Sequence, residues 1–188
     1  MAEDEFGGFY GSAESGHVFS SNALRLDLYR LQCIFEASQP MALKCIDSLG
    51  CPTRVMLDDH EEEEITRLMI STSIFGRMLD DRFTLIKSRG RFEHNEKWFE
   101  WLQAPVGELL PDLPNEIEEP LNLREAFNKV LHANKMNFDV EVGATPSNRY
   151  LRPYLYLYGT KGRKGWRATI NVYQFVEKLY NLSVHVGY

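Results

Sequence analysis

Hydrophobic residues recur at helical spacing through the first two thirds of the chain. The first pattern begins at Ser21 or Asn22, either of which can cap a helix, and its apolar side carries Leu24, Leu28, Leu31 and Phe35. Pro40 predicts a break in this helix. Residues 41–50 then indicate a short second helix that ends at Gly50.

The strongest helical pattern covers residues 58–83, "DDHEEEEITRLMISTSIFGRMLDDRF". Its acidic run at 58–64 would occupy the first turns, where the helix dipole favours negative charge. Near the other end, Asp81 follows Arg77 by four residues, so we expect these two side chains to pair within the helix. The apolar stripe of this helix consists of Ile65, Leu68, Met69, Phe75 and Leu79.

Two shorter helices are predicted farther along the chain. Residues 95–103, "NEKWFEWLQ", indicate a short surface helix, and the Pro-rich residues 105–120 indicate a loop. A further helix is predicted over residues 121–134, opened by Pro120 or Asn122.

After this helix the hydrophobic period changes from 3.6 residues to two, which is typical of strands. Residues 136–143, 150–159 and 166–176 alternate in this way, and the last two flank a basic, Gly-rich turn that predicts a β-hairpin. The chain should end in a helix that continues from the last strand. These patterns predict an α+β fold: a mainly helical body over residues 19–135, then a small C-terminal antiparallel hairpin or sheet and a terminal helix over 136–188. Residues 1–18 are acidic and rich in Gly and Ser, so we expect a flexible arm that precedes this single domain.

The charge and cysteine content narrow the classes of function. The formal net charge is −6 and the pI is near 5.4, which argues against binding of duplex DNA through overall positive charge. Cys33, Cys45 and Cys51 form no Cys-x-x-Cys pair, and no signal peptide is apparent, so we expect reduced thiols in a cytoplasmic protein. No apolar run reaches the roughly 18 residues of a membrane span, and no membrane association is expected.

Several common kinds of site have no counterpart in the sequence. The five histidines form no His-x-x-x-His pair, and the acidic run lacks the alternation and the Gly of a calcium loop. The chain has no Gly-x-Ser-x-Gly nucleophile elbow. We therefore expect neither a metal nor a cofactor.

The basic turn of the hairpin is a candidate nucleic-acid contact. Positive charge is concentrated there around one aromatic ring, in Lys161, Arg163, Lys164, Trp166 and Arg167. A base can stack on an aromatic ring while cations pair with phosphates. The alternative is that these residues form a solvated hairpin tip.

The helix at 121–134 carries the best candidate for a catalytic site. Arg124, Asn128 and His132 are four residues apart and form one polar ridge, while Glu125 and Lys129 form an exposed ion pair beside it. An imidazole can transfer a proton near neutral pH, and a guanidinium can bind a phosphodiester. The alternative is a structural role, in which Asn128 and His132 bond to the neighbouring helix or loops.

The segment "LREAFNKVLHA", which follows an earlier helix ending in "FGRMLDD", resembles the HEPN superfamily of small helical proteins from bacterial defence and toxin systems. HEPN members carry an Arg, then four to six residues, then a His. His132 matches the motif His and Arg124 the motif Arg, with seven residues between them. The position nearer the usual spacing holds Phe127 and Asn128, and no Arg. The resemblance implies a metal-independent ribonuclease that acts as a dimer with its motif helices facing each other.

Two functions stay open on these grounds. One is a HEPN-like protein of a bacterial or mobile-element defence or toxin system, which cleaves RNA or binds RNA or nucleotides, as a homodimer. The other is a non-catalytic interaction protein, an inhibitor or accessory subunit. Its acidic and hairpin surfaces would bind a protein partner with a basic surface.

Overall fold

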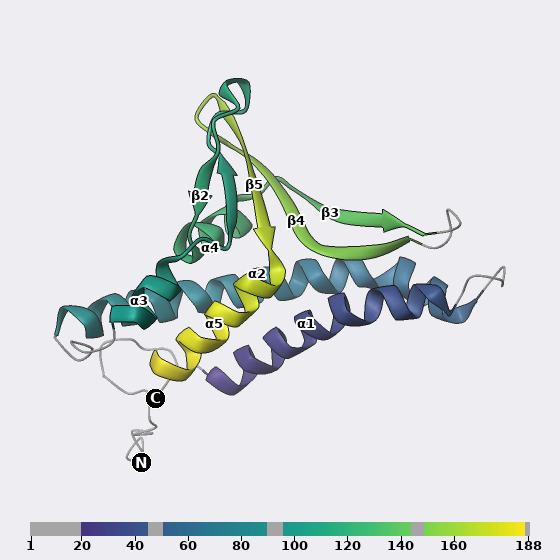
Figure 1. The fold of residues 1–188 in the computed structure, drawn as a ribbon, viewed down its shortest axis with the longest axis horizontal. Helices are drawn as coiled ribbons and strands as arrows, with labels where there is room; N and C mark the ends of the chain where they lie inside the picture. The colour runs from purple at the N-terminus through teal and green to yellow at the C-terminus, as the bar shows by residue number, and fades with distance from the viewer. Residues whose placement is uncertain (1–19, 45–50, 90–95, 144–148, 187–188) are drawn as a thin grey trace, which may run out of the picture.

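The protein has an α+β fold in which a helical body supports one five-stranded antiparallel sheet (Figure 1). The computed structural model describes residues 20–44, 51–89, 96–143 and 149–186. In chain order its elements are α1 (Ser21–Leu43), α2 (Pro52–Ser88), α3 (Glu96–Gln103), β1 (Gly107–Leu110), η1 (Leu113–Asn115), β2 (Glu119–Leu121), α4 (Leu123–His132), β3 (Lys135–Val142), β4 (Arg149–Lys161), β5 (Lys164–Asn171) and α5 (Val172–Val186). The predicted fold class is confirmed, and the predicted arm at residues 1–18 lies outside the described residues.

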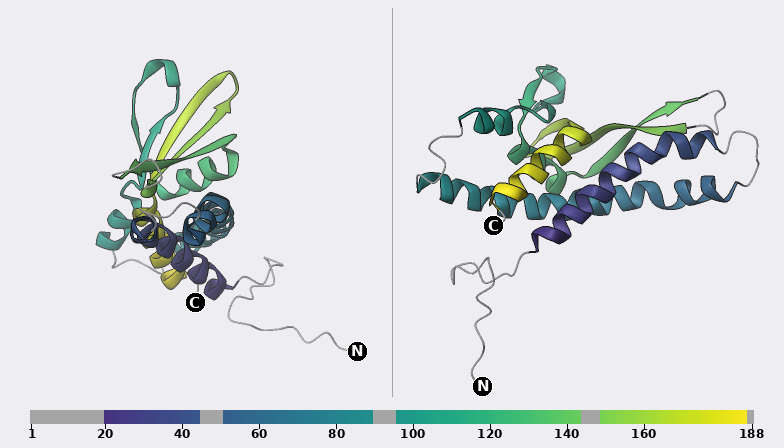
Figure 2. Two further views of the ribbon diagram at one scale, coloured as in Figure 1. Left: turned by 90° about the vertical axis from the view of Figure 1, so that its right-hand side faces the viewer. Right: turned by 60° about the horizontal axis from the view of Figure 1, so that its bottom comes forward.

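Two long helices, α1 and α2, run side by side and form the base of the molecule (Figures 1 and 2). Ser20 caps α1, because its side chain accepts a hydrogen bond from the Ala23 amide. The predicted apolar positions of both helices meet in the core, except that Phe75 is only half-buried. The buried members of these two stripes are Leu24, Leu28, Leu31, Phe35, Ile65, Leu68, Met69 and Leu79.

The sheet has the strand order β2-β1-β5-β4-β3, and α1, α2 and α5 lie below it in Figure 1. Along β4 and β5 the residues that face the helices are buried, and those between them are half-buried or exposed. Between two paired positions, β4 advances four residues, from Leu151 to Leu155, while β3 advances two, from Val140 to Phe138. This bulge, which contains Pro153, accompanies the sharp bend of β4 in Figure 1.

The structure corrects four sequence-based predictions about the elements. Pro40 does not end α1, which continues to Leu43. The helix predicted at 58–83 begins at Pro52, so the acidic run lies beyond its first turn and the helix dipole does not explain it. Residues 105–120 are not simply a loop, because they contain β1 and most of β2. The last strand ends at Asn171, so residues 172–176 belong to α5.

A cluster of charged side chains ties the first half of α2 to the start of β4. The Arg54 guanidinium donates to an Asp58 carboxylate oxygen at 3.0 Å and to the Arg149 carbonyl at 2.8 Å, and Arg149 pairs with Asp58 at 2.9 Å. Glu61 lies one turn farther along α2. Burial raises the pKa of its carboxyl, against the lowering effects of a hydrogen bond from Ser38 and the charges of both arginines.

The two described cysteines differ in state. Cys33 has a free thiol, as expected, whereas Cys51 is disulfide-bonded. The expectation of three reduced thiols is therefore wrong for Cys51, and the cysteines do not by themselves indicate a reducing compartment. Among the described residues, no helix combines the length and the apolar character that a membrane crossing requires.

Candidate nucleic-acid interface

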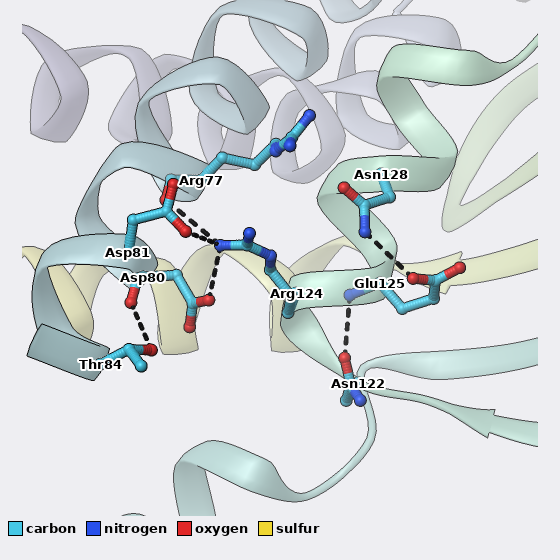
Figure 3. A network of polar contacts seen from close by, with 8 residues as sticks. All are labelled: Arg77, Asp80, Asp81, Thr84, Asn122, Arg124, Glu125 and Asn128. Atoms are coloured by element: carbon cyan, nitrogen blue, oxygen red, sulfur yellow. Dashed lines mark hydrogen bonds and ion pairs between the residues drawn. The ribbon is translucent and has the colours of Figure 1, made fainter. Parts of the chain in front are cut away.

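Arg124, at the start of α4, is held by two carboxylates of α2 (Figure 3). Its Nη1 atom donates to Asp80 Oδ2 at 2.9 Å and to Asp81 Oδ1 at 2.6 Å. Nη1 also lies 3.5 Å from the Arg77 carbonyl oxygen. Asp81 therefore pairs with Arg124, and the prediction of a pair with Arg77 within the helix is wrong.

These contacts offset the positive charge of Arg124. The hydrogen bond to Asp81 is the main effect that raises the pKa of the guanidinium, which stays charged. Burial raises the pKa of Asp80, although the charge of Arg124 opposes this shift. When both carboxyls are ionised, the cluster has a net charge of −1, so it offers little attraction to a phosphate.

Asn128, the middle residue of the ridge, binds within its own helix. Its Nδ2 atom donates to Glu125 Oε2 at 3.1 Å, and the other oxygen of Glu125 accepts from Lys129 Nζ at 3.1 Å. Burial alone would raise the pKa of Glu125, but the hydrogen bonds from Asn128 and Lys129 lower it. The predicted Glu125–Lys129 pair is confirmed, but Lys129 is buried rather than exposed.

Lys129 also connects α4 to the hairpin. Its Nζ atom lies 4.5 Å from the centre of the Trp166 ring, a cation–π contact. Trp166 is 2% exposed, so its ring belongs to the core and presents no face on which a base could stack. A side chain at Gly159, across the hairpin, would overlap the same ring, which leaves no room between the two strands.

His132 ends α4 and is exposed. Within the described part of the chain, its imidazole has no hydrogen-bond partner, so it lacks the expected structural contact to a neighbouring helix. It lies eight positions after Arg124 in the same helix, roughly 12 Å along the axis. The ridge therefore consists of three separate local arrangements and not of one assembled site.

Phe127 occupies the position on α4 that is nearer the usual spacing of the HEPN motif. Its side chain is fully buried and packs edge-to-face on Phe175 of α5, with ring centres 5.6 Å apart. The ring also lies directly against Gly76 of α2. At this position the chain has a core contact in place of a cationic side chain.

Three of the four predicted cations of the hairpin are exposed. Lys161 and Arg163 are open to solvent, whereas Lys164 pairs with Asp112 at 2.7 Å. Arg167 is half-buried, and its nearest carboxylate oxygen, on Glu118, is 3.6 Å away. The tip therefore carries positive charge that nearby carboxylates only partly offset.

A row of aromatic rings, which was not predicted as a site, lies on the face of the sheet opposite the core. Tyr154, Tyr156 and Tyr158 alternate along β4 with the buried Leu155 and Leu157, and all three are half-buried. We call this row, with the flanking Arg152 and Arg167, the tyrosine face. The alternation in "YLRPYLYLYG" was visible in the sequence, but the sequence could not show which row faces solvent.

The tyrosine face also carries cations and hydrogen-bonding groups. Asn137 and Thr169 sit directly beside Tyr156 on the neighbouring strands. Burial and the Asp139 carboxylate raise the pKa of Tyr156, while the charges of Arg167 and Arg152 lower it. Its hydroxyl therefore remains protonated at neutral pH and can donate a hydrogen bond.

Comparisons with models of protein families, with curated proteins and with solved structures found no match for this chain. Among the described residues, His, Cys, Asp and Glu side chains form no group of three or more that could hold a metal ion.

Proposed function

We propose that this protein binds single-stranded RNA on the tyrosine face and does not cleave it. The observation that carries the proposal is the row formed by Tyr154, Tyr156 and Tyr158, whose rings alternate with core residues on one strand. Sequence-tolerant recognition of single strands uses aromatic rings on which bases stack, beside cations that contact the backbone. A duplex keeps its bases stacked on each other and gives these rings nothing to bind.

The charges around the row support an RNA ligand. Arg152 lies 3.7 Å from Asp139 and 3.8 Å from Glu141, and Arg167 lies 3.6 Å from Glu118. These ion pairs are long and partly exposed, so each stabilises the fold little, and a phosphate can replace the carboxylate. Lys161 and Arg163 extend the positive charge to the hairpin tip.

The arrangement of α4 favours binding without cleavage. Asp80 and Asp81 offset the charge of Arg124, and His132 lies on the order of 12 Å farther along the helix. We therefore infer that Arg124 and His132 of one chain do not act together on one phosphodiester. The proposal thus keeps the RNA ligand that the HEPN resemblance implies and omits the reaction.

The test is a titration of fluorescently labelled oligouridine, and of an RNA duplex, with the protein while anisotropy is recorded. We expect the oligouridine to bind more tightly than the duplex. Tyr156→Ala should weaken oligouridine binding roughly tenfold, because one stacked base contributes about 1–3 kcal/mol. Tyr29→Ala is the matched control, since Tyr29 is 67% exposed on α1, far from the sheet face in sequence.

Equal binding of duplex and single strand would contradict the proposal, and so would an unchanged affinity of Tyr156→Ala. Absence of RNA binding would instead favour the protein-partner function that the acidic and hairpin surfaces suggest.

A further inference from the structure

The two edges of the sheet differ in how open they are to another strand. The β2 edge has three residues, and one of them is Pro120, which cannot donate a backbone hydrogen bond. The β3 edge has eight residues, Lys135–Val142, without Pro or Gly. Among the described residues β3 pairs on one side only, with β4, so its other side presents a long row of backbone donors and acceptors.

The sequence of β3 is complementary to itself in antiparallel pairing. If two copies of β3 are paired with Phe138 opposite Phe138, then Lys135 lies opposite Glu141 of the other copy. In the same register Met136 lies opposite Val140, and Asn137 lies opposite Asp139. Opposite charges, apolar residues and hydrogen-bonding side chains therefore each meet a suitable partner, and a twofold axis repeats every pair.

The exposure of the apolar side chains of β3 also fits this pairing. Met136, Phe138 and Val140 lie on the core side, since they pair with the buried Leu157, Leu155 and Leu151 of β4. Toward the end of the strand this apolar row is uncovered, with Val140 37% and Val142 61% exposed. A second β3 strand would cover part of this row.

We propose that the free edge of β3 pairs with β3 of a second copy of this chain, in the antiparallel register centred on Phe138. The result is a homodimer with one continuous ten-stranded sheet, twice the five strands of each copy. The twofold axis stands perpendicular to the sheet, so both tyrosine faces lie on the same side. The dimer does not depend on RNA binding, because it rests on the β3 edge alone.

This arrangement differs from the one that the HEPN resemblance implies. The residue that ends α4, His132, precedes Phe138 by six positions. The two copies of His132 therefore lie at opposite ends of the paired strands, roughly 40 Å apart at the rise of an extended chain. The two copies of α4 do not face each other in this dimer.

Charge exchange between Lys135 and Glu141 tests the pairing and its register together. Lys135→Glu places two glutamates opposite each other at both ends of the interface, and Glu141→Lys places two lysines there. Each single variant should weaken the dimer about tenfold or more in sedimentation experiments at low salt. The double variant Lys135→Glu/Glu141→Lys should dimerise like the wild type, and an equimolar mixture of the two single variants should form heterodimers.

The matched controls are Lys44→Glu and Glu63→Lys, which make the same charge changes at exposed positions on α1's end and on α2. Circular dichroism checks that every variant is folded. A monomeric wild type would overturn the proposal. A dimer that neither single variant weakens, or that the double variant fails to restore, would also overturn it, because the interface would then lie elsewhere or have another register.

Discussion

The ionisation of Glu61 should affect the fold, because this residue lies where α1, α2 and β4 meet. Its pKa is raised by burial, so between its unfolded and folded pKa values the folded state binds more protons than the unfolded state. This group therefore stabilises the fold less as the pH rises through that interval, which begins near the ordinary glutamate value of about 4.3. We predict that Glu61→Gln removes this pH-dependent loss of unfolding free energy.

Denaturant unfolding of both proteins from mildly acidic to neutral pH measures the effect. The unfolding free energy of Glu61→Gln minus that of the wild type should increase with pH and then level off. Only the change of this free-energy difference with pH tests the prediction. Its size at a single pH does not, because the substitution also changes contacts with Ser38 and the two arginines. Glu63→Gln, at an exposed position of the same helix, is the matched control. A difference that stays constant with pH would refute the prediction.

At the scale of elements, one close contact between α4 and α2 is made by Phe127 and Gly76. The ring of Phe127 lies against Gly76, where a Cβ atom would overlap it. We predict that Gly76→Ala lowers the unfolding free energy by about 1–2 kcal/mol, because the overlap costs about 1–3 kcal/mol. The better helix propensity of Ala offsets this cost by up to about 1 kcal/mol.

Urea denaturation of a double-mutant cycle identifies the cause. Phe127→Leu removes the ring that the new methyl group would meet, so Gly76→Ala should cost less in that background. The coupling should be on the order of 0.5–3 kcal/mol. If Gly76→Ala costs the same in both backgrounds, the overlap with Phe127 is not its cause.

At the scale of helices and strands, the sequence predicted those elements whose hydrophobic pattern repeats within one segment. The stripe from Leu24 to Phe35 predicts a helix because four apolar residues repeat within one segment, and α1 contains this stripe, although it continues past Pro40. The strands β1 and β2 escaped prediction because they have four and three residues among several prolines. β1 pairs with β5, which is far away in the chain, and β2 joins the sheet only through β1. A periodicity argument contains no such information.

The candidate site, too, was predictable only where it depends on residues close together in the sequence. The spacing of Arg124, Asn128 and His132 placed these residues on one ridge, but the carboxylates that bind Arg124 lie more than forty residues earlier. The burial of Trp166 and the half-exposure of Tyr156 depend on which face of the sheet the helices cover. Only tertiary structure decides that question.

In the whole molecule, α4 and the tyrosine face lie on opposite sides of the sheet. Lys129 of α4 lies against Trp166 on the core side, whereas Tyr156 lies on the opposite face. RNA bound on the tyrosine face is thus separated from His132 by the sheet. We therefore predict that the wild-type protein leaves bound oligouridine intact in the presence of EDTA, which excludes contaminating metal-dependent nucleases.

His132→Ala distinguishes the two outcomes. If the protein only binds RNA, this variant should bind oligouridine like the wild type, because its imidazole has no partner among the described residues and does not border the tyrosine face. Gel electrophoresis of the RNA after prolonged incubation gives the cleavage readout, and anisotropy gives the affinity. Cleavage that persists in EDTA and disappears in His132→Ala would show that α4 carries the ribonuclease chemistry that the HEPN resemblance implies. The cation that His132 lacks beside it would then come from α4 of a partner copy, in a dimer whose α4 helices face each other.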